Sequence, residues 1–320
     1  MKYVLAPLAG FTDAPFRLMA TEGGADLTYT EMVSAAGLAH GSSPTRHLME
    51  VLPGEGPVAC QLFGSRETDL AFAARTVPSG RFCELNLNAG CPMTKVTREG
   101  AGAKLVEDPE KVFRLLRAMS ENTSLPVTLK TRLGPRPDRT RIFELLDAAE
   151  RAGARGISVH ARYASQMHGG DVHLEILAEL VRSAHVPVTG NGSVVDAGTA
   201  AEMAATGVAA IMVGRAALAD PAVFARLKGL AGERRASAAS AGALCRRHLE
   251  HVLAFRDRLA QRYPNDHIPS ADGFASVRMH THLFRYFNGL PGASALRARL
   301  NTVRTCEQIY GIIRDYECNH

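Results

Sequence analysis

Residues 141–160 read RIFELLDAAERAGARGISVH, and this stretch contains the unit from which the fold can be inferred. Positions 141–151 are typical of an amphipathic helix. Gly153 suits the end of that helix, because glycine adopts a positive φ without steric cost. The β-rich run 156–160 that follows predicts a strand. The stretch therefore predicts a helix, a glycine turn and a strand in succession.

The same alternation repeats along residues 1–228. We expect strands at 3–7, 26–30, 57–62, 82–87, 126–130, 156–160, 187–190 and 210–213. We expect helices at 14–21, 67–76, 109–120, 141–151, 174–183, 197–205 and 221–227. Eight strands alternating with helices predict an α/β fold, a (β/α)₈ barrel with a parallel sheet. An open doubly wound sheet is the alternative, but no G-x-G-x-x-G follows the first strand.

A stretch of small and polar residues at about 229–240 is typical of a linker. Residues 241–320 show helical periodicity and no run typical of a strand. We therefore expect two parts, a TIM barrel over 1–230 and a small all-α helical domain over 241–320.

The composition is 46% hydrophobic and 22% charged, which is typical of a folded chain. No secretory leader and no apolar run long enough to cross a bilayer is evident, so we expect a cytoplasmic protein without a membrane partner. The six cysteines lack C-x-x-C or zinc-type spacing, which indicates reduced thiols and no metal site. Cys60 and Cys83 are expected to fill the core. Nothing in the sequence implies an obligate protein partner.

The net charge of +5 is unevenly distributed. Residues 1–230 hold 24 Lys and Arg against 24 Asp and Glu, whereas residues 231–320 hold 13 Arg against 8 acids. A local basic excess favours polyanionic partners such as RNA or DNA, although many basic proteins bind no nucleic acid.

Residues at the carboxyl ends of barrel strands form the face on which active sites of this fold lie. In this chain those positions are polar and diverse: Pro7-Leu8-Ala9-Gly10, Glu31, Gln61, Asn88 with Cys91, Lys130, His160 with Arg162, Asn191-Gly192 and Gly214-Arg215. The turns after strands seven and eight are the usual phosphate site, and Asn191-Gly192-Ser193 and Gly214-Arg215 predict one there.

Three of these residues allow more than one interpretation. Lys130 ends an apolar strand, where its ammonium needs an anionic ligand or a partner such as Glu31. His160 is either a ligand or a hydrogen-bonded core residue. Cys91 lies on a long loop that runs through Gly102, and it can be a nucleophile, a proton donor or a bystander.

The chain resembles the tRNA-dihydrouridine synthase family over nearly its whole length. The resemblance is carried by seven segments in order, namely 6–17 (APLAGFTDAPFR), 61–64 (QLFG), 84–92 (ELNLNAGCP), 129–132 (LKTR), 159–162 (VHAR), 190–193 (GNGS) and 212–215 (MVGR). It implies an FMN-binding barrel followed by a helical RNA-binding domain, and it implies that FMN and NADPH serve the reduction of uridine in tRNA to dihydrouridine.

The resemblance also implies site residues. Cys91 takes the position of the general acid that protonates C5 of the uracil, while hydride from flavin N5 goes to C6. Cofactor contacts fall on Pro7, Leu8, Ala9, Gln61, Lys130, His160, Asn191, Gly192, Ser193, Gly214 and Arg215. We expect Asn88 to orient the uracil and Arg162 to meet a phosphate or carbonyl of the substrate.

In the tail, Arg278, His282 and Arg285 share one face of an expected helix, and Met279 and Leu283 lie on another. We expect the first three to contact RNA phosphates, the alternative being a solvated amphipathic face. Two other functions remain as alternatives, a small-molecule flavin dehydrogenase of the dihydroorotate or dihydropyrimidine type and a non-catalytic RNA-binding barrel. The first would not need the basic tail, and the second would not need Cys91.

Overall fold

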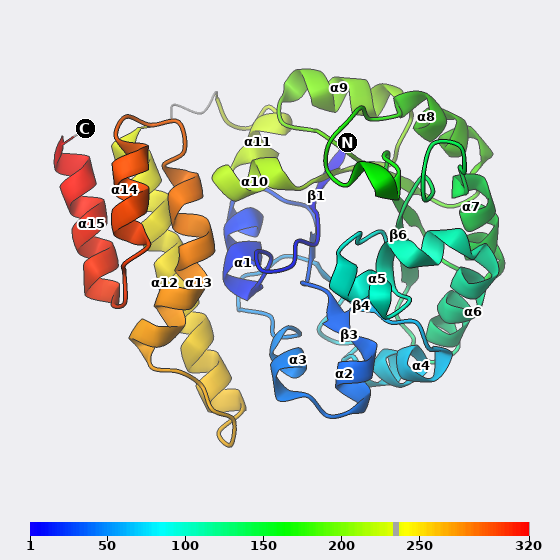
Figure 1. Cartoon of the computed structure of the whole chain (residues 1–320), viewed down its shortest axis with the longest axis horizontal. Helices are drawn as coiled ribbons and strands as arrows, with labels where there is room; N and C mark the ends of the chain where they lie inside the picture. The colour runs from blue at the N-terminus through cyan, green and yellow to red at the C-terminus, as the bar shows by residue number, and fades with distance from the viewer. Residues whose placement is uncertain (233–236, 320) are drawn as a thin grey trace.

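The computed structural model describes residues 1–232 and 237–319, and in it the first part of the chain is a parallel barrel surrounded by helices (Figure 1). The sheet order is β1-β9-β8-β7-β6-β5-β4-β2. A parallel bridge between Val4 and Leu27 brings the first and last strands of this order together. The strands are β1 (Lys2–Leu5), β2 (Thr28–Tyr29), β3 (Val33–Ser34), β4 (Val58–Phe63), β5 (Glu84–Ala89), β6 (Val127–Arg132), β7 (Ile157–His160), β8 (Val188–Asn191) and β9 (Ala210–Val213). The predicted (β/α)₈ barrel is confirmed.

The second predicted strand differs from the observed structure, because it is divided in two. Both β2 and β3 pair with β4, but Thr28 lies opposite Val58 whereas Val33 lies opposite Leu62, so the ladder gains one residue on this side. Between the two strands, the backbone N–H of Gln61 donates to the side-chain hydroxyl of Thr30 at 3.0 Å. A side-chain oxygen thus replaces a carbonyl as acceptor, and the strand bends where the pairing shifts.

The helices cover the outside of the barrel and continue into a separate group near the C-terminus (Figure 1). The longer barrel helices are α1 (Ala14–Glu22), α4 (Glu67–Thr76), α6 (Pro109–Ser120), α7 (Ile142–Arg151), α8 (Leu174–Ser183) and α9 (Ala197–Ala205). Shorter helical segments are α2 (Ala35–Ala39), α3 (Ser43–His47), α5 (Thr94–Arg98), η1 (Gly102–Glu107), η2 (Ala164–Gln166), α10 (Arg215–Ala219) and α11 (Val223–Leu227). Within the described residues, no helix is long and apolar enough to cross a bilayer.

Four helices follow the barrel, and we call them the helical lobe: α12 (Ala238–Arg262), α13 (Ala271–Tyr286), α14 (Ala293–Leu300) and α15 (Cys306–Asn319). The first of them begins inside the range expected for the linker, since Ser237 caps it by accepting a hydrogen bond from the N–H of Ser240. The remaining linker positions 233–236 lie outside the described residues.

Alternation of side chains along the strands divides the barrel into two surfaces. On β5, Leu85 and Leu87 belong to the main core between the sheet and the helices. A smaller apolar cluster, which includes Val4, Tyr29 and Met212, lies on the other face of the strands. The inner face of the barrel is therefore only partly apolar, and polar side chains fill the rest.

The helical lobe packs on the barrel through a shared apolar cluster. Ala14 and Leu18 of α1 and Leu52 belong to the same buried cluster as residues of α12, α13 and α15. Burial of this kind contributes roughly 25 cal/mol for each Å² of apolar surface removed from water. The lobe and α1 are therefore held together by a continuous core.

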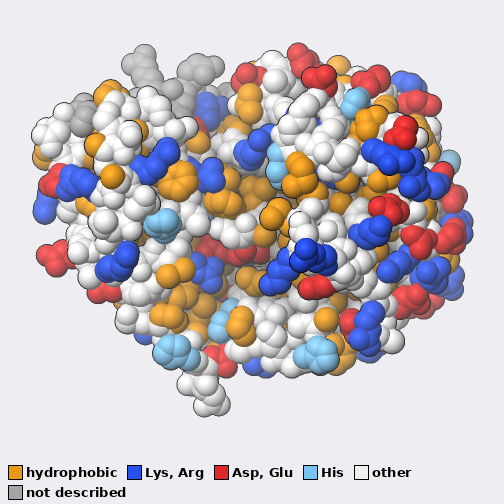
Figure 2. Space-filling view, viewed as in Figure 1, with side chains coloured by type: hydrophobic (Ala, Val, Ile, Leu, Met, Phe, Trp, Pro, Cys, Tyr) orange, Lys and Arg blue, Asp and Glu red, His pale blue; other side chains and the backbone are white. Residues whose placement is uncertain are grey.

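Ion pairs surround this apolar contact, and they explain part of the basic excess of the tail. The side chain of Glu50 is fully buried and pairs with Arg81 of the barrel at 3.0 Å and with Arg258 and Arg262 of α12 at 3.3 and 2.8 Å. Tyr263 adds a hydrogen bond to the same carboxylate at 2.7 Å. Figure 2 shows Lys and Arg side chains on both sides of the junction, with acidic side chains between them. Several tail arginines thus serve docking within the molecule.

We expect Glu50→Gln to lower the free energy of unfolding by about 3 kcal/mol, because three guanidinium groups lose the buried carboxylate that compensates them. Urea unfolding of the full chain measures this change.

The matched control is Glu67→Gln. Glu67 pairs with Arg114 at 3.0 Å, but both side chains are about half exposed, so its loss should cost less than about 1 kcal/mol. Equal effects of the two substitutions would show that Glu50 does not stabilise the junction.

Candidate active site

Most of the site residues expected from the sequence meet where the strands end. Strand pairing sets Asn88 of β5 beside Lys130 of β6, and it sets His160 of β7 beside Asn191 of β8. The side chains then touch across the strands: Lys130 Nζ donates to Asn191 Oδ1 at 3.4 Å, and Asn88 Nδ2 donates to Gln61 Oε1 at 2.8 Å. The alternative pairing of Lys130 with Glu31 is not observed, since the Glu31 carboxylate accepts from the N–H of Gly10.

The loop that carries Cys91 is held by the side chain of Asn88. Asn88 Oδ1 accepts hydrogen bonds from the backbone N–H groups of Gly90 at 3.1 Å and Cys91 at 3.0 Å. The carbonyl of Cys91 accepts from the N–H of Ala103 at 2.8 Å. Gly102 has φ +59°, and a Cβ there would lie 2.6 Å from the Cys91 carbonyl oxygen. Only glycine fits at position 102 without displacing the loop. In this loop conformation the Cys91 side chain is half-buried.

Four cationic side chains gather around this loop and the neighbouring strand ends: Lys130, Arg132, Arg162 and Arg215. None of them forms an ion pair with a carboxylate in the described ranges 1–232 and 237–319. Arg132 Nε donates to the carbonyl of Gly90 at 2.8 Å, and Arg162 donates to Ser193 Oγ at 2.8 Å. Uncompensated charges are costly to bury, so this cluster fits an anionic ligand.

The cluster changes the protonation of its members. Burial, and after it the charge of Arg132, lowers the pKa of Lys130 to about 8. Burial, and then Lys130 and Arg132, lowers the pKa of His160 far below its ordinary value. His160 is therefore neutral, and its Nε2 accepts from Arg162 at 3.2 Å. Burial also lowers the pKa of Arg132 to about 10.

The turn predicted to bind phosphate contains two successive residues with positive φ. Gly192 has φ +144°, and Ser193 has φ +52°, which is uncommon for a residue with a side chain. Asn191 Nδ2 donates to the carbonyl of Met212 at 2.8 Å, which ties β8 to β9. Gly214 follows β9 directly, and a Cβ built there would lie 3.6 Å from Ala6. The turns after β8 and β9 are thus adjacent, small and close to the end of β1.

The loop after β1 brings three further predicted residues to this edge. The backbone N–H of Ala6 donates to the carbonyl of Val213, so the loop starts beside β9. Pro7 and Leu8 are half-buried and Ala9 is exposed. The N–H of Leu8 donates to Thr12 Oγ1 at 3.0 Å. The flavin contacts assigned to these three residues stay a prediction.

The predicted RNA contacts of α13 divide into two groups. His282 is only 2% exposed, and its ring stacks on Phe16 of α1 at 4.8 Å between centroids. The prediction that it contacts RNA is therefore wrong for this arrangement, because the histidine fills the junction with the barrel. Arg278 pairs with Asp13 at 2.9 Å and so also serves docking. Arg285 is half-buried, with its guanidinium 4.7 Å from the ring centre of Phe11.

Three residues were missed or misplaced by reasoning from the sequence. Arg132 received no role, although its position two residues after Lys130 places it on the same inner face. Arg162, expected at the substrate, is buried and donates to the carbonyl of Gly170 at 2.8 Å and to Ser193, so it supports the turn after β8. Cys60 is buried as expected, but Cys83 is exposed just before β5 and is not core filling.

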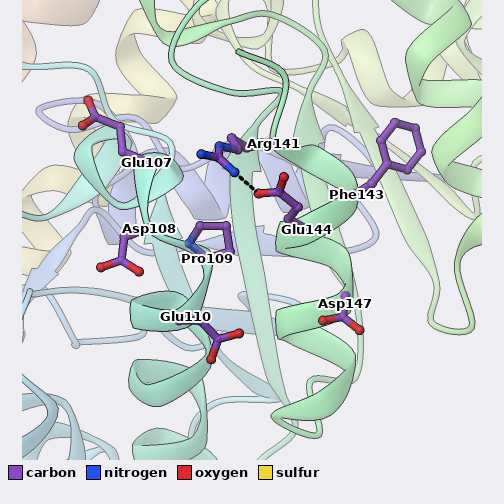
Figure 3. Close-up of a pocket in the computed structure, with 8 residues that line it drawn as sticks. All are labelled: Glu107, Asp108, Pro109, Glu110, Arg141, Phe143, Glu144 and Asp147. Atoms are coloured by element: carbon purple, nitrogen blue, oxygen red, sulfur yellow. Dashed lines mark hydrogen bonds and ion pairs between the residues drawn. The ribbon is translucent and has the colours of Figure 1, made fainter.

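A hollow of about 560 Å³ lies away from these residues, between the starts of α6 and α7 (Figure 3). Its lining is mainly acidic: Glu107, Asp108, Pro109, Glu110, Arg141, Phe143, Glu144 and Asp147. Its single cation, Arg141, is already paired with Glu144. A surface of this charge repels anionic ligands, so we place the active site at the barrel mouth instead.

A parallel barrel whose mouth combines cations without carboxylate partners among the described residues, a small glycine-containing turn and a thiol loop fits an enzyme that acts with an anionic cofactor or substrate. The family model described as "Dihydrouridine synthase (Dus)" matches residues 4–313. The chain belongs to the dihydrouridine synthase family. By class it is a flavin-dependent oxidoreductase.

Two relatives and one solved structure illustrate the similarity. The "tRNA-dihydrouridine synthase B" of Xanthomonas campestris is 31% identical over 322 residues, which cover 98% of this chain and 92% of the relative. The "Probable tRNA-dihydrouridine synthase" of Rhodobacter capsulatus is 34% identical over 272 residues, covering 83% and 84%. A structure of mandelate oxidase with benzoyl-formic acid has a TM-score of 0.48 at 21% identity, covering 72% of this chain and 73% of that one.

The pKa of Lys130 predicts how affinity for an anionic flavin nucleotide depends on pH, with FMN as the probe. An anion beside the ammonium favours its charged form, so below about pH 8 the lysine is already protonated and binding has its full strength. As the pH rises through about 8, binding must take up a proton, and the affinity should fall by up to about tenfold per pH unit. Fluorescence titration with FMN between about pH 7 and 9.5 measures this.

Lys130→Met provides the control for that titration. We expect it to bind FMN about tenfold more weakly at pH 7, which corresponds to about 1.4 kcal/mol, and to lose the decline above pH 8. If wild type and Lys130→Met show the same pH dependence, another group is responsible.

Proposed function

We propose that the protein reduces uridine in tRNA to 5,6-dihydrouridine, with FMN as its flavin and NADPH as the reductant. The observation that carries the proposal is the juxtaposition, at the barrel mouth, of the half-buried thiol Cys91 with the unpaired cations Lys130 and Arg132. The family membership supports the same reaction, and the names of the two relatives specify tRNA.

The residues at the mouth fit a flavin mononucleotide. The turn of Asn191, Gly192 and Ser193, with Arg162 bound to Ser193, offers a small and cationic surface for the phosphate. Lys130 offers its ammonium to the anionic edge of a reduced flavin ring. When bound, the flavin supplies the hydride that adds to C6 of the uracil.

The remaining chemistry belongs to the side chains of this chain. Hydride addition at C6 leaves enolate-like negative charge on the uracil, which a proton at C5 discharges. The Cys91 thiol supplies that proton as a general acid. Asn88 holds the backbone of Cys91 in place, since its Oδ1 is bound to two N–H groups of the loop. A uridine stacked in RNA must be flipped out to reach this mouth, at a cost of a few kcal/mol.

The helical lobe offers cations for the RNA backbone beyond those used in docking. The guanidinium groups of Arg285 and Arg297 each lie 5.2 Å from the centre of the Phe284 ring. Neither guanidinium is paired with a carboxylate among the described residues. Arg285 also covers Phe11, which belongs to the loop after β1. This row of cations and aromatic rings leads from the lobe toward the barrel mouth, and it suits phosphate contact and base stacking.

Cys91→Ala should retain bound FMN and RNA affinity but lose turnover by a factor of about 10² to 10⁴, because the general acid is missing. The measurement is nucleoside mass spectrometry of unmodified tRNA incubated with protein, FMN and NADPH, in which each product uridine gains two mass units. Cys83→Ala, an exposed cysteine before β5, is the control and should keep full activity.

Full turnover by Cys91→Ala would refute the proton-donor role. Reduction of free pyrimidines without any reduction in RNA would instead favour a small-molecule flavin dehydrogenase.

Arg297→Gln should weaken tRNA binding about three- to tenfold and reduce the slope of log affinity against log salt by about 1. The matched control is Arg299→Gln on the same helix, because Arg299 is already paired with Asp315 at 2.6 Å. Filter binding at several salt concentrations distinguishes them, and equal losses would argue against the row that contains Phe284.

A further inference from the structure

The inner face of β5 carries a row of polar side chains that the proposed chemistry leaves largely unused. Glu84, Asn86 and Asn88 occupy alternate positions and point into the barrel, whereas Leu85 and Leu87 face the helices. Barrel interiors are usually filled by branched apolar side chains. Buried polar side chains of this kind destabilise the folded state unless their hydrogen bonds are satisfied.

These residues are joined in one chain of hydrogen bonds from the bottom of the barrel to its mouth. Asn88 Nδ2 donates to Gln61 Oε1 at 2.8 Å, and Gln61 Nε2 donates to Asn86 Oδ1 at 2.7 Å. Asn86 Nδ2 then donates to Thr128 Oγ1 at 2.7 Å, and Thr128 Oγ1 donates to Glu84 Oε1 at 3.0 Å.

The donor-to-acceptor direction of these hydrogen bonds is determined at both ends of the row. An ionised carboxylate only accepts hydrogen bonds, and Glu84 accepts from Thr128 and also from Tyr29 at 2.8 Å. At the other end, backbone N–H groups only donate, and Asn88 Oδ1 accepts from Gly90 and Cys91. Every amide between these ends has one orientation that satisfies both neighbours. Turning one around would leave buried groups unpaired, at about 1–3 kcal/mol each.

The row of hydrogen bonds ends at the backbone N–H of Cys91 and does not include the Cys91 thiol. It therefore has no part in moving the proton, and its effect on Cys91 is to hold the loop in position. Burial raises the pKa of Glu84, and the hydrogen bonds from Tyr29 and Thr128 oppose that rise. In both bonds the Glu84 carboxyl oxygen is the acceptor.

We propose that Glu84, Thr128 and Asn86 are positioning residues, which fix the loop of Cys91 from the interior of the barrel through the side chains of Gln61 and Asn88. Only the consequence for turnover rests on the proposed function, because the position of the loop can be measured without it.

The test is Thr128→Val, which keeps the shape of the side chain and removes the hydroxyl between Asn86 and Glu84. The rate at which iodoacetamide alkylates Cys91, followed by peptide mass spectrometry on the full chain, should rise at least threefold. Alkylation of the exposed Cys318 serves as internal reference and should not change. Thr128→Ser restores the hydroxyl and should return the rate to that of wild type.

Thr206→Val is the matched control. Thr206 is a buried threonine whose hydroxyl donates to the carbonyl of Met203 at 2.7 Å, and it has no hydrogen bond to the residues between Glu84 and Asn88. It should lose a similar amount of stability and leave alkylation of Cys91 unchanged. If Thr128→Val does not fold, Asn86→Ala removes the next link and should raise the rate in the same way.

Turnover separates this inference from the proposed function. We expect Thr128→Val to lower kcat on tRNA about tenfold with KM nearly unchanged. Faster alkylation of Cys91 in a protein whose wild type reduces no uridine would support the positioning role and refute the proposed function. Equal alkylation rates in Thr128→Val, Thr206→Val and wild type would refute the positioning role, whatever the activity.

Discussion

Closing a parallel sheet on itself gives each strand an inner face that meets water only at the ends of the barrel, and this constraint governs the rest of the structure. Side chains alternate between that face and the helix-covered face. Leu129 therefore belongs to the outer core, while its neighbours Thr128 and Lys130 point inward. Where inward groups are polar, they must satisfy one another or be satisfied by a ligand at the mouth.

Both solutions occur in this barrel. Below the mouth, the amide oxygen and the amide nitrogen of Gln61 and of Asn86 each have a protein hydrogen-bond partner. At the mouth, Lys130 and Arg132 have hydrogen bonds to neutral oxygens but no carboxylate partner among the described residues. The first arrangement gives rigidity, and the second leaves a surplus of positive potential that favours an anionic ligand. The two regions are adjacent, so the cations at the mouth lie next to a hydrogen-bonded interior.

Much of this could be predicted from the sequence, for reasons that particular residues illustrate. The strands could be predicted because short β-rich runs and helices have different hydrophobic periodicities. The site residues could be predicted because the carboxyl ends of all strands meet at one face of a parallel barrel. The split between β2 and β3 could not be foreseen, because it depends on the hydroxyl of Thr30 taking a backbone position. The burial of His282 could not be foreseen either. Its spacing puts it with two arginines, and only the approach of Phe16 makes that face an interior one.

The burial of Glu50 has a consequence for how the chain is assembled during synthesis. The barrel segments emerge first, and at that stage Glu50 has Arg81 but not the two arginines of α12. Leu18 and Leu52 also remain uncovered until the lobe arrives. An unfinished chain therefore exposes an apolar surface beside an incompletely neutralised acid, which is the type of intermediate that chaperones bind. The helical lobe thus completes the burial of residues that lie near the start of the barrel sequence.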